Sequence, residues 1–117
     1  MKRRVRFVSL LVLAPALVGG CSTQSERERI LKQDLMVMRQ AIDNYTLDKL
    51  QAPQSLQDLV NGHYLKEIPT DPFTWKKDWV LYFGDTALTP DQTNTGITDV
   101  HSNSTQVGSN GSTYNTW

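Results

Sequence analysis

Residues 25–49 read SERERILKQDLMVMRQAIDNYTLDK, and this stretch decides the fold. Its apolar residues recur at alternating spacings of four and three, which is the period of a helix with one buried face. They are Leu31, Leu35, Met38, Ile42 and Tyr45, and the stripe is widened by Ile30, Val37 and Ala41. Ser25 followed by Glu28 fits a capping box. The pattern therefore predicts an amphipathic helix from Glu26 to about Lys49.

The length of this helix predicts a surface beyond the core. A helix from Glu26 to Lys49 measures about 36 Å at 1.5 Å per residue, which is longer than so small a domain covers. We therefore expect its first turns to project, and we expect Ile30 and Leu31 to contact a partner helix. The alternative is that most of the apolar residues of the stripe simply make the core.

The next segment carries helix and turn signals. Ser55 with Asp58 repeats the capping pattern and Gly62 suits a left-handed C-cap, so a second helix of two turns is predicted. Pro69 and Pro72 then force an extended turn. Near these prolines we expect the apolar residues Tyr64, Leu65 and Ile68 to pack into the domain. We expect the side chain of Asp71 to cap the turn.

Two strands are predicted in the second half of the chain. Residues 79–83 read WVLYF and are dense in aromatic and branched side chains, and residues 97–101 form a shorter strand. Residues 89–96 are expected to be a polar loop. The core is expected from the helix stripe together with Trp79, Leu81 and Phe83. Helices followed by strands indicate an α+β domain.

The chain begins with three parts in the order of a secretory signal. Lys2 to Arg6 is basic, Phe7 to Val18 is mostly apolar, and Gly19 and Gly20 stand before Cys21. The apolar run is about a dozen residues long, whereas a helix needs roughly 20 residues to span a bilayer. A cleaved signal is therefore favoured over a permanent transmembrane anchor.

Residues 17–21, LVGGC, resemble the lipobox of bacterial lipoproteins. The resemblance implies that a signal peptide, residues 1–20, is removed and that Cys21 receives a diacylglyceryl thioether and an acylated amino terminus. Residues 21–25 would then be a lipidated linker. An ordinary cleaved signal with an incidental cysteine is the alternative. Because Ser22 rather than Asp follows the cysteine, a periplasm-facing place on the outer membrane is favoured over the inner membrane.

Charge and cysteine content exclude several classes of protein. The net charge of the whole chain is zero, and removing the four basic residues of the leader leaves eight basic against twelve acidic residues. An acidic domain is a poor match for a phosphate backbone, so no nucleic acid partner is expected. Cys21 is the only cysteine, which rules out an internal disulfide and a zinc-binding cysteine set.

No residue pattern indicates catalysis. His63 and His101 are the only histidines, and neither lies in an HExxH spacing or near a GxSxG motif. Asp43 and Asp48 are not spaced to share one helical face as an acid and base pair. We therefore expect no enzymatic activity.

Residues 62–73, GHYLKEIPTDPF, and residues 99–102, DVHS, resemble the periplasmic domain of the major pseudopilin, type II secretion system protein G. The helical segment 38–48, MRQAIDNYTLD, is similar as well, and the resemblance covers Ile30 to Ser102. It implies a long N-terminal helix packed on a small antiparallel sheet, within a domain spanning residues 26–117. It also implies a subunit of a helical pseudopilus that works in protein secretion.

The leader departs from the pseudopilin pattern. A pseudopilin carries a Phe-Thr-Leu-Ile-Glu-like stretch in a long membrane helix, whereas Phe7 to Leu11 reads FVSLL without a glutamate. Two functions therefore stay open. The first is a lipid-anchored pseudopilin relative that assembles with other secretion-system proteins, and the second is a free-standing envelope lipoprotein that uses this fold to bind proteins.

The C-terminal tail is a second departure. From Ser102 it consists mainly of Ser, Thr, Asn and Gly until Tyr114 and Trp117, whose rings are expected to pin a loop. The resemblance implies a calcium site here, with Asp99, Ser102 and Asn103 as candidate ligands. Calcium takes about six to eight oxygen ligands, several of them from carboxylates, and Asp99 is the only acidic residue in this region. We therefore expect hydrogen bonds to close the tail, and no metal or other cofactor.

Overall fold

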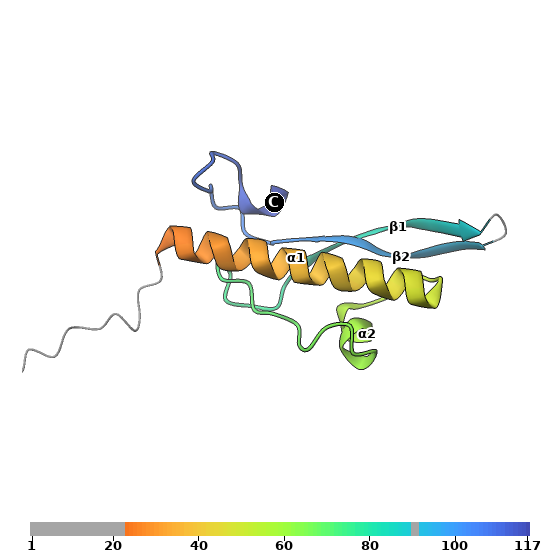
Figure 1. Cartoon of the computed structure of the whole chain (residues 1–117). Coiled ribbons are helices and arrows are strands. Elements are labelled where there is room, and N and C mark those ends of the chain that lie inside the picture. The colour runs from red at the N-terminus through yellow and green to blue at the C-terminus, as the bar shows by residue number, and fades with distance from the viewer. Residues whose placement is uncertain (1–22, 90–91) are drawn as a thin grey trace, which may run out of the picture.

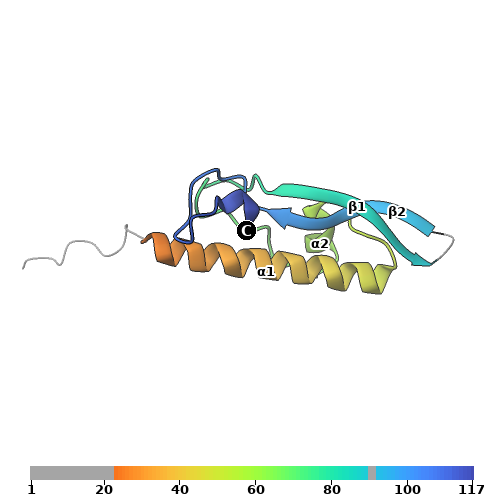
Figure 2. The ribbon, with the colours of Figure 1, turned by 90° about the horizontal axis from the view of Figure 1, so that it is seen from above.

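The computed structural model describes residues 23–89 and 92–117, so the predicted signal peptide and Cys21 lie outside the described residues. The chain forms an α+β domain (Figure 1). Its elements are α1 (Gln24–Lys49), α2 (Leu56–Asn61), β1 (Val80–Thr89), β2 (Gln92–His101) and the short 3-10 helix η1 (Tyr114–Thr116). Figures 1 and 2 show β1 and β2 running along α1 and reaching past its C-terminal end. None of the helices in the described ranges has the length and hydropathy needed to cross a bilayer.

The long helix α1 ends at Lys49 as predicted but begins two residues earlier, at Gln24. Its N-cap is Thr23, whose hydroxyl accepts a hydrogen bond from the Glu26 amide at 3.3 Å. The predicted capping box of Ser25 and Glu28 is therefore wrong. The carboxylate of Glu28 instead bonds a distant part of the chain.

The second helix, α2, is confirmed together with its predicted N-cap. The Ser55 hydroxyl accepts a hydrogen bond from the Asp58 amide at 3.2 Å. The predicted left-handed cap at Gly62 is wrong, since Gly62 has a φ of −86° and the left-handed residue is His63, with a φ of 64°. The absence of a side chain at Gly62 leaves room for the ring of Tyr64, because a Cβ there would lie 2.9 Å from that ring.

The antiparallel sheet is longer than predicted. Most of the predicted loop at residues 89–96 is strand, because β2 begins at Gln92. Polar cross-strand contacts continue the hairpin, as the Thr95 hydroxyl donates to the Asp85 carboxylate at 2.8 Å. The free edge of β2 is covered by the connection after α1, since the Ile97 amide donates to the Pro53 carbonyl at 2.8 Å.

The core lies between α1, α2, β2 and the loops around them. Its buried apolar members are Leu31, Leu35, Met38, Ala41, Ile42, Leu56, Leu59, Leu65, Phe73, Trp79, Ile97, Val100 and Tyr114. Because α1 packs against β2, the outer strand β1 contributes little beyond the partly buried Leu81. Phe83 pairs with the buried Ile97 but is 56% exposed, so its predicted place in the core is wrong.

The C-terminal segment, residues 102–117, turns back beside the first half of α1 (Figure 2). Tyr114 is 0% exposed, as expected of a residue that pins the loop. This cover leaves Glu28 only 5% and Leu31 0% exposed, so the prediction that the first turns project is wrong. Leu31 cannot contact a partner helix as predicted, whereas Ile30 is 42% exposed.

Leu31→Ala should therefore lower the free energy of unfolding by about 2–5 kcal/mol, because it leaves a cavity in the core. Ile30→Ala, one residue away on the exposed side, should cost less than about 1 kcal/mol. Urea unfolding of the two variants measures both values. Equal losses would contradict the burial of Leu31.

Candidate partner-binding groove

The carboxylate of Glu28 joins α1 to the C-terminal segment. It accepts hydrogen bonds from the Ser109 amide at 2.7 Å, the Ser109 hydroxyl at 2.6 Å and the Tyr114 hydroxyl at 2.8 Å. Gln24 adds a longer bond at 3.3 Å. The two bonds from Ser109, ahead of those from Tyr114 and Gln24, hold the pKa of Glu28 below its ordinary value of 4.5. The ionised carboxylate is thus the form that holds this segment in place.

Aromatic packing supports the same junction. The ring of Tyr114 stacks on Phe73 with centroids 3.8 Å apart and an interplanar angle of 19°. The Trp117 ring meets Tyr114 edge-on at 4.8 Å, and its indole nitrogen donates to the Ser112 hydroxyl at 2.8 Å. The indole of Trp117 is therefore fixed beside α1.

Arg39 ties the middle of α1 to the end of β2 and to the C-terminal segment. Its guanidinium donates to Asp99 at 2.8 Å, to the Val100 carbonyl at 2.9 Å and to the backbone oxygen of Trp117 at 2.7 Å. Burial acts to raise the pKa of Asp99, but hydrogen bonds from the Val100 amide and from Arg39 outweigh it and hold the pKa below its ordinary value of 3.8. His101 also contacts Asp99, at 3.0 Å.

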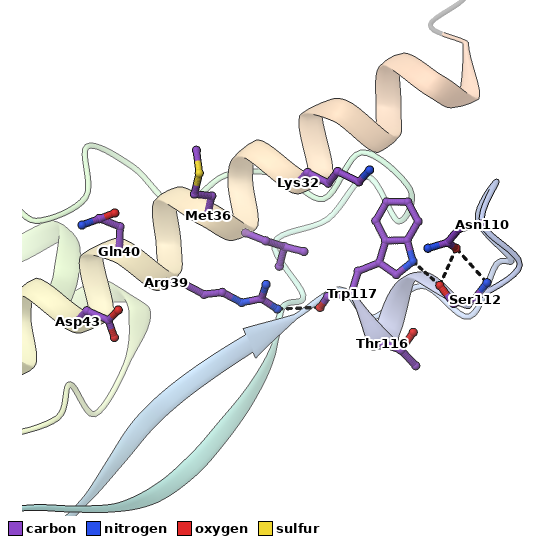
Figure 3. Close-up of a pocket in the computed structure, with 10 residues that line it drawn as sticks. Lys32, Met36, Arg39, Gln40, Asp43, Asn110, Ser112, Thr116 and Trp117 are labelled. Carbon is purple, nitrogen blue, oxygen red and sulfur yellow. Dashed lines mark hydrogen bonds between the residues drawn. The ribbon is translucent and has the colours of Figure 1, made fainter.

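A groove of about 620 Å³ lies between α1 and the C-terminal segment. Figure 3 shows Lys32, Met36 and Gln40 along the helix on one side and Trp117 with Asn110 on the other. Met36 is 56% exposed, and the Lys32 ammonium lies 5.1 Å from the centre of the Trp117 ring. Apolar surface from Met36 and Trp117 thus lies between amide and ammonium groups.

This composition suits binding of a protein segment more than chemistry. Met adapts its shape to a partner, and Trp combines a large apolar surface with a polar edge. Arg39 and Asp43 carry opposite charges at the groove, and Arg39 is already hydrogen-bonded within the domain. The lining therefore presents no concentrated charge of one sign to a ligand.

The predicted calcium candidates each bond a different protein partner. Asp99 pairs with Arg39, Ser102 donates its hydroxyl to Asp71, and the Asn103 amide donates to Asp78 at 3.2 Å. Within residues 23–89 and 92–117, no group of three or more His, Cys, Asp or Glu side chains could hold a metal ion.

Asp71 caps its turn as predicted and also joins the C-terminal segment. One carboxylate oxygen accepts from the Phe73 amide at 2.8 Å and the other from the Ser102 hydroxyl, and the residue is 0% exposed. Asp34 on α1 is close enough to Asp71 for their carboxylates to repel each other. Burial first, and then repulsion from Asp71, raise the pKa of Asp34 from 3.8 to about 6.

Most of the groove residues carry no signal in the sequence. Lys32, Met36 and Arg39 lie on α1 beside the core stripe, and no local signal distinguishes them from solvated helix residues. The one signal in the sequence was the aromatic Trp117 at the end of a polar tail. Its expected role in pinning the tail is confirmed by its contacts with Tyr114 and Ser112. Ile30 lies outside the groove and lines a separate hollow together with Asp34.

Comparison of the chain with protein-family models, curated proteins and solved structures gave no match.

The Glu28 bonds predict an acid-sensitive C-terminal segment. Because the folded pKa of Glu28 is below 4.5, its stabilisation is complete above that value and is lost as the pH falls through the folded pKa. Hydrogen-exchange protection of residues 107–114 should therefore drop in acid. In Glu28→Gln the protection should be lower already at pH 7 and should change less with pH, whereas the exposed-site control Glu67→Gln should behave as the wild type. Identical protection in Glu28→Gln and wild type at pH 7 would contradict the clamp.

The raised pKa of Asp34 predicts a dependence of stability on pH that is opposite to that of Glu28. Since its folded pKa is about 6 against an ordinary 3.8, the charged form destabilises the fold increasingly as the pH rises through this window. Asp34→Asn should therefore raise the melting temperature at pH 8, and the gain should disappear near pH 4. Asp43→Asn, an exposed aspartate on the same helix, is the control for thermal unfolding at both pH values. If Asp34→Asn is no more stable than the wild type at pH 8, the charged Asp34 does not destabilise the fold.

Proposed function

We propose that this chain is a lipid-anchored assembly component of a type II secretion-like system, a relative of the major pseudopilin. In this proposal the domain binds a partner protein along α1. The observation that carries it is the groove of Met36, Lys32 and Trp117, which is open, partly apolar and held by fixed neighbours. Such a surface matches the aromatic and methionine content of protein interfaces.

The rigidity of the groove supports a binding role. Glu28 and Arg39 attach the C-terminal segment to α1 on both sides of Lys32, and Tyr114 fills the space between that segment and the helix. A partner would therefore meet a surface that needs little ordering, and less binding free energy is lost to immobilising side chains.

The family part of the proposal rests on sequence. The segment from Leu65 to Phe73 resembles the pseudopilin turn, and the chain has the coarse order that the resemblance implies, a long helix, a short helix and an antiparallel pair of strands. Lipidation at Cys21 would take over the role of the membrane helix of a pseudopilin, because several acyl chains hold a protein stably on a bilayer. The domain would then face the periplasm, with the outer membrane favoured.

The second candidate is a free-standing envelope lipoprotein that binds proteins through the same groove. The ordered polar tail favours this alternative, because Asn110 and Thr116 add amide and hydroxyl groups to one wall. Neighbouring genes for a secretion ATPase and a secretin would favour the first candidate, and their absence would favour the second, since fold alone does not fix function.

The test is site-specific photo-crosslinking in living cells, with the photoreactive residue at Met36 of the full chain. Mass spectrometry of the product should identify a component of the secretion system. Met36→Asp should weaken this association at least about tenfold, a cost of about 1.4 kcal/mol, because it places a charge against apolar surface. Secretion of exported proteins by the host should fall with it.

Leu47→Asp is the matched control, since Leu47 is 66% exposed on the same helix but outside the groove. It should leave both association and secretion unchanged. Crosslinks to an unrelated envelope protein, with normal secretion in cells that lack this chain, would reject the first candidate in favour of the second.

A further inference from the structure

Trp75 is presented to solvent by a strained turn. The indole is 63% exposed, and the residue has a φ of 59°, in the left-handed region that bulky side chains seldom adopt. The turn is closed by the Trp75 amide donating to the Asp71 carbonyl at 2.8 Å and the Asp71 amide donating to the Lys76 carbonyl at 2.9 Å. The buried Asp71 therefore holds an aromatic residue outward at the cost of backbone strain.

The turn lies beside the first turns of α1 and has cationic residues next to it. The Arg27 guanidinium is 5.2 Å from the centre of the Trp75 ring, and the exposed Lys76 and Lys77 directly follow Trp75 in the chain. We call these four residues, Arg27, Trp75, Lys76 and Lys77, the Trp75 end. In the part of the chain that the structure describes, no carboxylate forms a salt bridge with any of these cations.

Acidic groups close to the Trp75 end are mostly occupied within the domain. Glu28 and Asp71 are buried and hydrogen-bonded, and Asp78 accepts bonds from Thr74 at 2.6 Å and Asn103 at 3.2 Å. The exceptions are Glu26, which is exposed on the first turn of α1, and the half-buried Asp34, which lies close enough to Asp71 to be repelled by it. The mature chain has an excess of acidic residues, so this cationic end stands out from the rest of the domain.

The distance from Cys21 to the Trp75 end is short. Only Ser22 separates Cys21 from Thr23, the N-cap of α1, and two peptide links span at most about 7 Å. Arg27 follows one turn later, about 6 Å further along the helix. The headgroup zone of a bilayer is about 5–8 Å deep on each side, so an anchor at Cys21 leaves the Trp75 end within side-chain reach of it.

We infer that the Trp75 end rests on the membrane, with the Trp75 indole among the headgroups and the surrounding Arg and Lys side chains on anionic lipids. This inference rests on the lipid anchor of the proposed function. Trp is the residue that prefers the interface between acyl chains and water, and basic side chains next to it are attracted to a negative surface. The contact would orient the groove relative to the bilayer.

The test uses the full chain, matured in cells, purified in detergent and reconstituted into vesicles of phosphatidylethanolamine and phosphatidylglycerol. Lipids brominated close to the headgroup quench tryptophan emission on contact. We expect quenching in the wild type, loss of most of it in Trp75→Phe, and retention in Trp117→Phe. Trp79, the third tryptophan, is 7% exposed and stays in place in all variants.

A second pair of variants tests the charge contribution without altering the indole. Lys76→Glu with Lys77→Glu should reduce the quenching, whereas Lys49→Glu with Lys66→Glu, which are also exposed but are not part of the Trp75 end, should leave it unchanged. Replacing phosphatidylglycerol with phosphatidylcholine should reduce it as well. An unquenched wild type, or equal quenching in wild type and Trp75→Phe, would overturn the inference.

The mass of the mature N-terminal peptide separates this inference from the anchor beneath it. An acylated Cys21 with an unquenched Trp75 overturns the membrane contact alone. An unmodified Cys21 thiol overturns the anchor and the contact together. Assembly with a secretion system is read separately by crosslinking at Met36, so its failure leaves the quenching result standing.

Discussion

Closure of the C-terminal segment over α1 depends on the ionised carboxylate of Glu28. Four donors converge on it, from Ser109, Tyr114 and Gln24, and charged hydrogen bonds of this kind are stronger than neutral ones. With the segment in place, Tyr114 and Leu31 are both fully buried and belong to the same core cluster. Without it, the first half of α1 would expose its apolar stripe to water.

This closure compensates for a thin sheet. Two strands alone are marginally stable in water, and the chain has a single cysteine, so no internal disulfide adds to the core. The C-terminal segment supplies the missing layer through its aromatic rings and through Ser102, which bonds the buried Asp71. Asp71 has partners for both carboxylate oxygens, and a buried charge without them would cost far more than it does here.

The same arrangement produces the two surfaces to which we assign function. The groove exists because Arg39 and Trp117 hold the end of the chain beside the middle of α1. The Trp75 end exists because Asp71 fixes a strained turn beside Arg27. One surface lies along the helix and the other close to its N-terminus, so a membrane contact at the second leaves the first free for a protein partner.

The sequence by itself determined what depends on neighbouring residues. The span of α1 to Lys49, the cap of α2 at Ser55 and the turn capped by Asp71 follow from local hydrogen bonds and helical periodicity. The β-rich segment at 79–83 was identified for the same reason, although its strand continues to Thr89. These features need no knowledge of what packs on them.

Only the tertiary structure decided which side chains the fold covers. Phe83 was expected inside but lies on β1, one strand away from α1, and Leu31 was expected outside but is fully buried in the core cluster that also holds Tyr114. Glu28 and Arg39 read as helix-surface charges in the sequence, and their partners lie 81 and 60 residues further along the chain. Periodicity reports which face of a helix is apolar, whereas burial depends on which distant segment arrives there, and that is fixed by contacts no local pattern encodes.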